Sequence, residues 1–230
     1  MMKQPSEAYA ILKSSVLFRG MNAEERRFAL TFLRASESSY KKGDYILRFG
    51  EKIPGFGLVL SGTLQVAMDD INGNRMIMAT VTPGGTFGAS LSFLDAEESP
   101  IYITATCDCS ILWLHTDALR QPRACTDLRA HDILQRFISM LADKTLEMNN
   151  RIQILSKRTL REKLITFFSQ QVRQAGRDAF TVPFDRGGMA DYLGADRSAL
   201  SRELSAMRRE GILTFHKNEF QILRAGMLHD

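Results

Sequence analysis

Long apolar runs and cysteine are both scarce in this sequence of 230 residues. No apolar run approaches the roughly 18 residues that suggest a membrane-spanning helix. The polar start MMKQPSEAYA also lacks the basic and apolar regions of a signal peptide. We therefore expect a protein that has no membrane partner and stays in the cytoplasm.

Only three cysteines are present, Cys107, Cys109 and Cys125. So few cysteines, and an odd number of them, argue against a disulfide framework. They also argue against an iron–sulfur cluster, which needs about four thiolates. Cys107 and Cys109 would point to the same face of a strand. The role of the three cysteines stays open between a thiol switch and small residues of the core.

The motifs of the common enzyme classes are missing as well. The chain has no Gly-x-Ser-x-Gly elbow, no Walker loop, no dinucleotide-binding fingerprint and no His/Glu spacing typical of a metal site. We therefore expect no catalytic activity, no bound metal and no resident cofactor.

Positive charge is concentrated in the C-terminal third of the chain. Residues 151–230 carry 14 Lys and Arg against 9 Asp and Glu, whereas residues 1–150 carry 16 against 17. A surface that binds phosphates needs such an excess. Four cations lie near the start of this region, namely Lys157, Arg158, Arg161 and Lys163. The sequence leaves open whether they contact phosphates or form a solvated face.

The stretch from Arg186 to Gly211 predicts a helix-turn-helix. Gly194 permits a left-handed turn after the first helix, and Asp196 is suited to cap a second helix from about residue 197 to residue 210. An ordinary pair of surface helices would have the same pattern. The β-prone runs that follow, around Lys217 and Asn218, predict a hairpin and so favour a winged helix.

The second helix of this pair has two distinct faces. Leu200, Leu204 and Met207 form an apolar stripe that must pack inward. The arginines and serines elsewhere on the helix can enter the major groove, where arginine donates to guanine and serine permits close approach. The predicted DNA-binding residues are Arg197, Ser198, Ser201, Arg202, Ser205 and Arg209.

The N-terminal half predicts helices followed by many short strands. Residues 6–38 have a helical pattern, with a break at Gly20 and a new start after Asn22. Between residues 40 and 114, β-prone runs alternate with Gly, Pro, Asn and Asp, which favours an antiparallel jelly roll. The predicted strands are Tyr45–Leu47, Phe56–Leu60, Gly62–Met68, Arg75–Val81, Ile101–Ala105 and Ser110–Leu114.

A long helix is predicted from residue 126 to residue 155. Apolar residues recur along it every seven residues and form a seam on one side. The seam favours a dimer, although Lys144 and Arg151 interrupt it and the helix could instead pack on its own barrel. The predicted interface residues are Leu134, Phe137, Ile138, Leu141, Thr145, Met148, Ile152 and Leu155.

These elements add up to an α+β fold. We expect an N-terminal double-stranded β-helix, or jelly roll, as a sensor domain at residues 1–125. The dimerisation helix follows at residues 126–155, and a winged helix-turn-helix occupies residues 156–230.

Three motifs in this order resemble the Crp/Fnr family of bacterial transcription regulators. Residues 41–51 and 58–66 are similar to the opening strands of the family's cyclic-nucleotide-binding jelly roll. Residues 84–88, GGTFG, are similar to the entrance of its phosphate-binding cassette, and residues 196–204 are similar to its recognition helix. The resemblance runs from about Phe18 to Leu223.

The resemblance implies a homodimer that binds a palindromic site in double-stranded DNA, with RNA polymerase as a further partner. Arg202 matches the family's base-reading arginine, whereas Ser198 stands where the family often has a glutamate. The operator sequence therefore does not follow from the resemblance. It also leaves open whether the protein activates or represses.

The same resemblance argues against cyclic AMP as the effector. Cyclic-AMP-binding members have a glutamate after the Phe-Gly and an arginine about ten residues later, but here Ala89 and the pair Ser99-Pro100 take these places. The remaining cavity suits an apolar or aromatic metabolite, or the barrel is filled by its own side chains. The predicted pocket residues are Gly88, Ala89, Ser90, Ser99, Pro100, Ile101, Met148 and Asn149.

A second function remains as an alternative, a ligand-binding regulatory module of the cyclic-nucleotide type that acts on protein partners. Such a module would need the jelly roll without a base-reading helix, and residues 186–223 argue against it.

Overall fold

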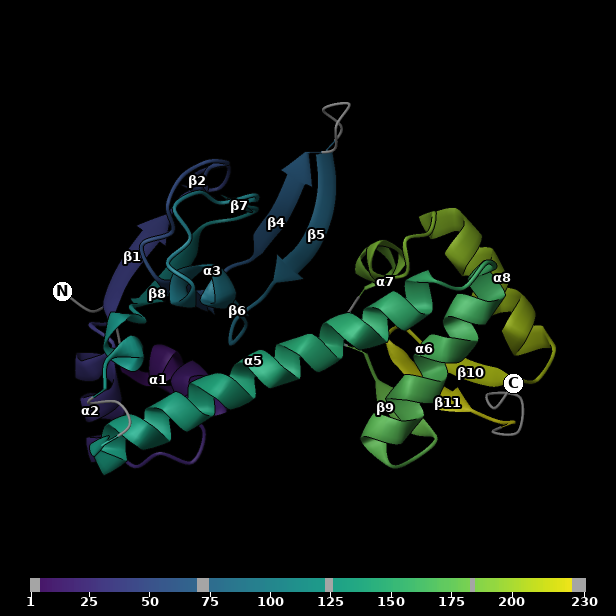
Figure 1. Cartoon of the computed structure of the whole chain (residues 1–230). Helices are drawn as coiled ribbons and strands as arrows, with labels where there is room; N and C mark the ends of the chain where they lie inside the picture. Colours follow the sequence, from purple (N-terminus) through teal and green to yellow (C-terminus); the bar gives the residue numbers. More distant parts are fainter. Residues whose placement is uncertain (1–4, 70–74, 123–125, 183–184, 225–230) are drawn as a thin grey trace. The chain divides into compact units, whose positions relative to one another are not determined.

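The computed structural model describes residues 5–69, 75–122, 126–182 and 185–224 (Figure 1). The chain divides into two compact units, Met1–Asp143 and Lys144–Asp230. The boundary falls within the long helix α5 (Leu128–Leu155), which therefore contributes residues to both units. The predicted α+β fold is confirmed.

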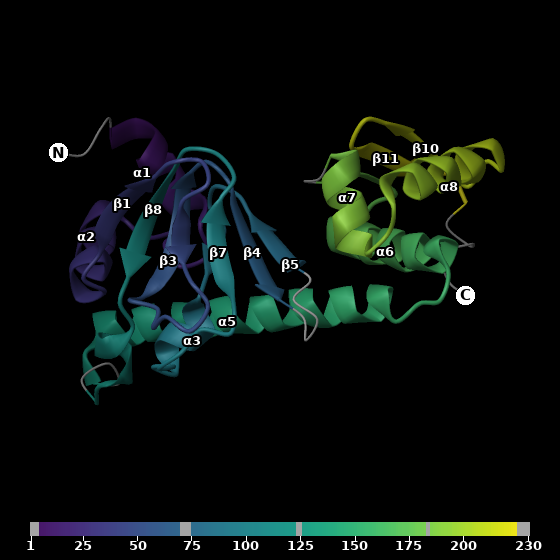
Figure 2. The ribbon, with the colours of Figure 1, turned by 90° about the horizontal axis from the view of Figure 1, so that it is seen from above.

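Two antiparallel sheets of four strands enclose a common core in the first unit. Their strand orders are β1-β8-β3-β6 and β2-β7-β4-β5. Figure 2 shows β1, β8 and β3 on one side of this unit and β7, β4 and β5 on the other. The strands are β1 (Ser36–Tyr40), β2 (Tyr45–Leu47), β3 (Phe56–Ser61), β4 (Leu64–Asp69), β5 (Arg75–Val81), β6 (Thr86–Phe87), β7 (Tyr102–Ala105) and β8 (Cys109–Leu114). The jelly roll and its six predicted strands are confirmed.

Strands β3 and β8 are mostly apolar because both of their faces are covered. Leu58 and Leu112 are paired and belong to the core on the outer side of the sheet. Val59 and Ile111, the next pair, belong to the core between the two sheets. Successive side chains of a strand point to opposite faces, so one sheet serves both cores.

The N-terminal helices are α1 (Pro5–Ser14) and α2 (Ala23–Phe32). The predicted helix start after Asn22 is confirmed, because its side chain accepts the backbone N–H of Glu24 at 2.9 Å. The prediction of helix as far as residue 38 is wrong. Arg34 adopts a φ of 48°, and the chain then enters β1, which hydrogen-bonds to β8.

The first half of α5 packs against the outer side of the β1-β8-β3-β6 sheet, beside the short helices α3 (Ala89–Phe93) and η1 (Asp117–Arg120). Phe137 of α5 is fully buried there. Its ring centroid lies 5.4 Å from that of Phe56 and 5.3 Å from that of Phe93. This corrects the prediction that Phe137 faces a partner subunit, because the side chain is enclosed by the core of its own subunit.

We expect Phe137→Ala to lower the free energy of unfolding of the first unit by about 3–5 kcal/mol, because it removes a buried ring and leaves a cavity. Urea unfolding monitored by the fluorescence of Trp113 measures this loss. Trp113 is the only tryptophan of the chain and lies in the core of this unit. Leu128→Ala on the same helix is the control. Leu128 is 86% exposed, and an equal loss there would contradict the assignment.

After α5, the described residues of the second unit form three helices and a small sheet of strand order β10-β11-β9. Its elements after α5 are α6 (Leu160–Ala175), β9 (Ala179–Thr181), α7 (Arg186–Leu193), α8 (Arg197–Arg209), β10 (Leu213–His216) and β11 (Glu219–Ile222). The ring of Phe168 on α6 lies 5.1 Å from that of Phe220 on β11 and joins the helices to the sheet. The predicted winged helix is confirmed.

Candidate functional site

Helices α7 and α8 are joined by a short turn with a fixed geometry. Gly194 ends α7 with a φ of 57°, which confirms the predicted left-handed glycine turn. Asp196 is the N-cap of α8, and its Oδ1 accepts the backbone N–H groups of Ser198 and Ala199, both at 2.9 Å. The caps at the two ends of this turn thus set the start of α8, as a helix-turn-helix requires.

Helix α8 has the two faces that its sequence predicts. Leu200, Leu204 and Met207 are fully buried in the core of the second unit. All the side chains predicted to contact DNA are exposed, namely Arg197, Ser198, Ser201, Arg202, Ser205 and Arg209. The helix can therefore be buried on one side and still offer donors on the other.

The guanidinium of Arg202 is connected to the N-cap through a hydroxyl. Its Nη1 donates to Ser198 Oγ at 3.2 Å, and Ser198 Oγ donates to Asp196 Oδ1 at 2.6 Å. Asp196 thus orients Arg202 through the hydroxyl of Ser198. The hydroxyl of Ser201 donates instead to a carbonyl of its own helix, Arg197 O at 3.0 Å.

The cap makes the stability of α8 depend on pH. The hydrogen bonds from Ser198 and Ala199 hold the pKa of Asp196 below its ordinary value of 3.8. A depressed pKa stabilises the folded state fully above the ordinary value, and this contribution is lost as the pH falls through the folded-state pKa. We expect Asp196→Ala to lower the unfolding midpoint at pH 7 and Asp196→Asn to preserve most of it, because asparagine also caps helices. Thermal unfolding of both variants measures this, and equal midpoints for the two variants would contradict the role of the cap.

The cations of α6 are used within the unit. Arg161 forms ion pairs with Glu203 and Glu210 of α8. Lys163 Nζ donates to Leu193 O at 3.0 Å, at the C-terminal end of α7. The sequence left open whether these two cations contact phosphates, and local spacing gave no sign of their partners.

Three of the predicted effector residues, Gly88, Ala89 and Ser90, form the start of α3. Gly88 is its N-cap, and the side chain of Ile53 occupies the space that a Cβ at Gly88 would need. The hydroxyl of Ser99 is used by its own loop, where it donates to Ile101 O at 2.9 Å. Ala89 is buried, whereas Ser90 and Pro100 are exposed.

The space between the two sheets holds aromatic side chains. The Phe87 and Trp113 rings meet edge to face with centroids 5.4 Å apart, and Phe87 covers Gly57 so closely that a Cβ there would overlap its ring. The indole of Trp113 donates to Tyr40 Oη at 3.2 Å. This packing is of the kind expected if the barrel is filled by its own side chains.

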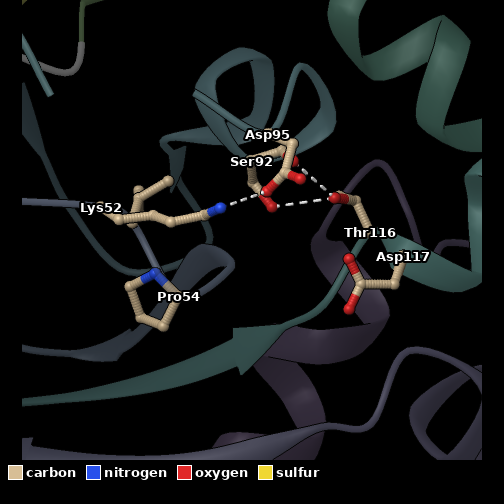
Figure 3. A pocket seen from close by; sticks show the side chains of 7 residues that line it. Lys52, Pro54, Ser92, Asp95, Thr116 and Asp117 are labelled. Carbon is tan, nitrogen blue, oxygen red and sulfur yellow. Dashed lines mark hydrogen bonds and ion pairs between the residues drawn. The ribbon is translucent and has the colours of Figure 1, made fainter. Parts of the chain in front are cut away.

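A surface pocket of about 430 Å³ lies beside α3 (Figure 3). None of the residues predicted for the effector site lines it. Its polar groups are paired with one another, since Lys52 Nζ lies 2.9 Å from Asp95 Oδ1 and the Ser92 and Thr116 hydroxyls are 3.0 Å apart. The lining residues are Lys52, Ile53, Pro54, Ser92, Asp95, Thr116 and Asp117.

Two of the predicted effector residues, Met148 and Asn149, belong to the second unit, so their part in a pocket stays a prediction. Met148 is 62% exposed and lies on the predicted dimer seam of α5. Ile138, Ile152 and Leu155 on the same seam are exposed as well. Leu134 and Leu141 are half-buried because they pack on the core of the first unit. Thr145 is exposed.

The cysteines occupy different environments. Cys109 is buried between the sheets, and this burial raises the pKa of its thiol. Cys107 is exposed and precedes β8, so the prediction that the two share one face of a strand is wrong. Cys125 lies outside the described residues. Within the described residues, no group of three or more His, Cys, Asp or Glu side chains is placed to hold a metal ion.

Comparison with known families matches the two units separately. Residues 37–122 match the cyclic nucleotide-binding domain, and residues 162–230 match the Crp-like helix-turn-helix domain. The first match covers the jelly roll, and the second begins in α6 and includes the candidate DNA-binding face. In the described part of the chain, no helix has the length and apolar character needed to cross a membrane.

Similar proteins cover most of the chain. The cyclic AMP receptor protein of Thermus thermophilus is 25% identical over 219 residues, which are 95% of this chain and 97% of the relative. The transcriptional activator protein FnrL of Cereibacter sphaeroides is 26% identical over 76% of this chain and 71% of its own length. The solved structure of FixK2 from Bradyrhizobium japonicum is 26% identical, with a TM-score of 0.55 over 85% of this chain and 96% of that one.

Proposed function

Because the chain belongs to the Crp/Fnr family of transcription regulators, we propose that it binds a palindromic operator as a homodimer under the control of an effector other than cyclic AMP. RNA polymerase is the further protein partner that this proposal implies.

The exposed arginine and serine face of α8 carries the proposal. Arginine offers paired donors to guanine O6 and N7, and the short serine side chains let the helix approach the base edges. Arg202 is the central candidate because its guanidinium is oriented by the hydrogen bonds through Ser198 to Asp196. The excess of positive charge in residues 151–230 would attract the phosphate backbone.

The apolar seam of α5 supports the dimer. Met148 and Ile152 are 62% and 60% exposed, and isolated subunits rarely leave such a row of large apolar side chains in water. Two helices packed along this seam would bring two recognition helices together on one DNA. A palindromic operator has half-sites about 34 Å apart on one side of the duplex, which only a twofold dimer matches.

The argument against cyclic AMP rests on its phosphate. A buried phosphate needs a cation or several donors, and Ala89 and Pro100 supply neither. The Ser99 hydroxyl is already committed to Ile101. A small apolar or aromatic metabolite would suit this region better, and a filled barrel that serves only as a dimer scaffold would need no effector.

We expect millimolar cyclic AMP to leave both the operator affinity and the thermal unfolding midpoint unchanged. A ligand that binds the folded state must raise its stability in proportion to the logarithm of ligand concentration over Kd. Differential scanning fluorimetry and a duplex-binding titration measure the two effects. A midpoint that rises with cyclic AMP concentration would refute this part of the proposal.

The proposed control acts through α5. Phe93 of α3 contacts Phe137 of α5, and the Thr86 hydroxyl of β6 lies 3.7 Å from Met140 Sδ. A rearrangement of α3 would therefore reach α5 through Phe93, and α5 contributes residues to the DNA-binding unit. We infer a two-state dimer in which this shift changes the spacing of the two recognition helices.

Selection of duplexes from a random library by the full-length protein, together with its mass in solution, tests the proposal. The expected result is an enriched inverted repeat bound by two chains of 25.9 kDa each. A single chain that ignores duplex DNA at low salt would refute it. That outcome would favour the alternative of a regulatory module that acts on protein partners.

A further inference from the structure

Arg161 lies in the first turn of α6 and holds two carboxylates of α8. Its Nε donates to Glu203 Oε1 at 2.6 Å, and its Nη1 and Nη2 donate to the two oxygens of Glu210 at 2.7 Å each. Bidentate pairs between arginine and carboxylate add geometric specificity to their strength. One guanidinium therefore ties the middle and the C-terminal end of α8 to α6.

The two carboxylates occupy unfavourable places on a helix that binds DNA. Glu203 directly follows Arg202, and Glu210 is the C-cap of α8, where the helix dipole disfavours negative charge. DNA phosphates would repel both of them. Hydrogen bonding to Arg161 lowers the pKa of Glu210 below its ordinary value, which is the expected effect of a compensating cation.

A second cation of the same helix supports this arrangement. Lys163 Nζ donates to Leu193 O at 3.0 Å and to Gly194 O at 3.4 Å, in the turn between α7 and α8. Two neighbouring cations of α6 thus hold the turn and the recognition helix at separate points. Both cations therefore bond to groups of their own unit and fix the orientation of α8 relative to α6.

We propose that Arg161 is a positioning residue for DNA recognition, which orients α8 and cancels the charges of Glu203 and Glu210 without contacting a phosphate. This inference rests on the proposed DNA binding. Since three of its N–H groups are bonded to carboxylates, Arg161 acts through those two residues. Its removal should therefore matter only while the carboxylates are present.

A double-mutant cycle tests this role. Arg161→Ala is made in the wild-type chain and in Glu203→Gln/Glu210→Gln, and each full-length protein is titrated with the duplex that the wild type selects, over a range of KCl concentrations. Arg158→Ala is the matched control. It removes the same charge from an exposed side chain near Arg161. Among the described residues, Arg158 forms no ion pair with α8.

In the wild-type background we expect Arg161→Ala to lower operator affinity roughly tenfold, a coupling usual for charged groups in contact. In the glutamine background we expect a change of less than about twofold. An equal loss in both backgrounds, with a salt dependence that falls as after loss of a phosphate contact, would overturn the inference.

The glutamine background keeps the test decisive if Arg161→Ala alone unfolds, because no carboxylate is left uncompensated there. Urea unfolding of every variant identifies such a case. A wild-type protein that binds no duplex would refute the proposed function. If the wild-type protein does bind, an equal loss of affinity from Arg161→Ala in the two backgrounds would refute only the role of Arg161.

Discussion

Replacing Arg202 with alanine should lower the affinity for the selected operator by roughly 5- to 150-fold, or about 1–3 kcal/mol. The side chain is exposed on α8, so its loss leaves the buried stripe of Leu200, Leu204 and Met207 intact. The loss should be largest at one base pair of each half-site, since a bidentate contact to guanine discriminates against the other bases. Titration with operators substituted at each position measures this pattern.

Arg173→Ala is the matched control for Arg202. It removes the same charge from an exposed side chain near the end of α6, far along the sequence from α8. If Arg202 acted only as a cation, its loss would weaken binding to every sequence alike, as the loss of any phosphate contact does. An unchanged base preference in Arg202→Ala would show that another residue reads the operator.

The double variant Met148→Glu/Ile152→Glu should convert the dimer into a monomer and weaken operator binding by roughly 100-fold or more. Two linked recognition helices gain this much because the second half-site is bound at a high effective concentration. The substitutions place four negative charges in the seam of the dimer, and both side chains are exposed in the single chain. Analytical ultracentrifugation should find the mass of one chain, 25.9 kDa.

Leu146→Glu supplies the control on the same helix. Leu146 is 62% exposed, as Met148 is, but it lies about 160° from Met148 around a helix of 3.6 residues per turn. We expect this variant to stay dimeric and to bind its operator. Full operator affinity in the double variant, measured as a monomer, would exclude a seam along α5 as the basis of DNA binding.

Elements with local signals could be predicted from the sequence. Strand β5 was expected at Arg75–Val81, where it lies, and the glycine turn at Gly194 was expected from the residue's tolerance of positive φ. Strand β1 could not be predicted in this way. Its sequence SESSY has few β-prone residues, and it is extended because β8 offers an unpaired edge.

The candidate site was predictable where it depends on one helix. The caps and the 3.6-residue period of α8 lie close together in sequence, so the exposed face followed from them. The partners of Arg161 did not follow, because Glu203 and Glu210 lie 42 and 49 residues away. Phe137 lies next to the seven-residue seam in the sequence, but this position alone does not tell whether its side chain meets the core of its own subunit or a partner.

Helix α5 supplies side chains to both hydrophobic cores, Phe137 to the first and Ile154 to the second. Arg151 also donates to the carbonyls of Asp191 and Tyr192 in the second unit. A fragment that begins at residue 156 would thus lack the fully buried Ile154 and an attachment of α7. Expression of a DNA-binding fragment should start no later than residue 144, so that the unit keeps its own portion of the helix.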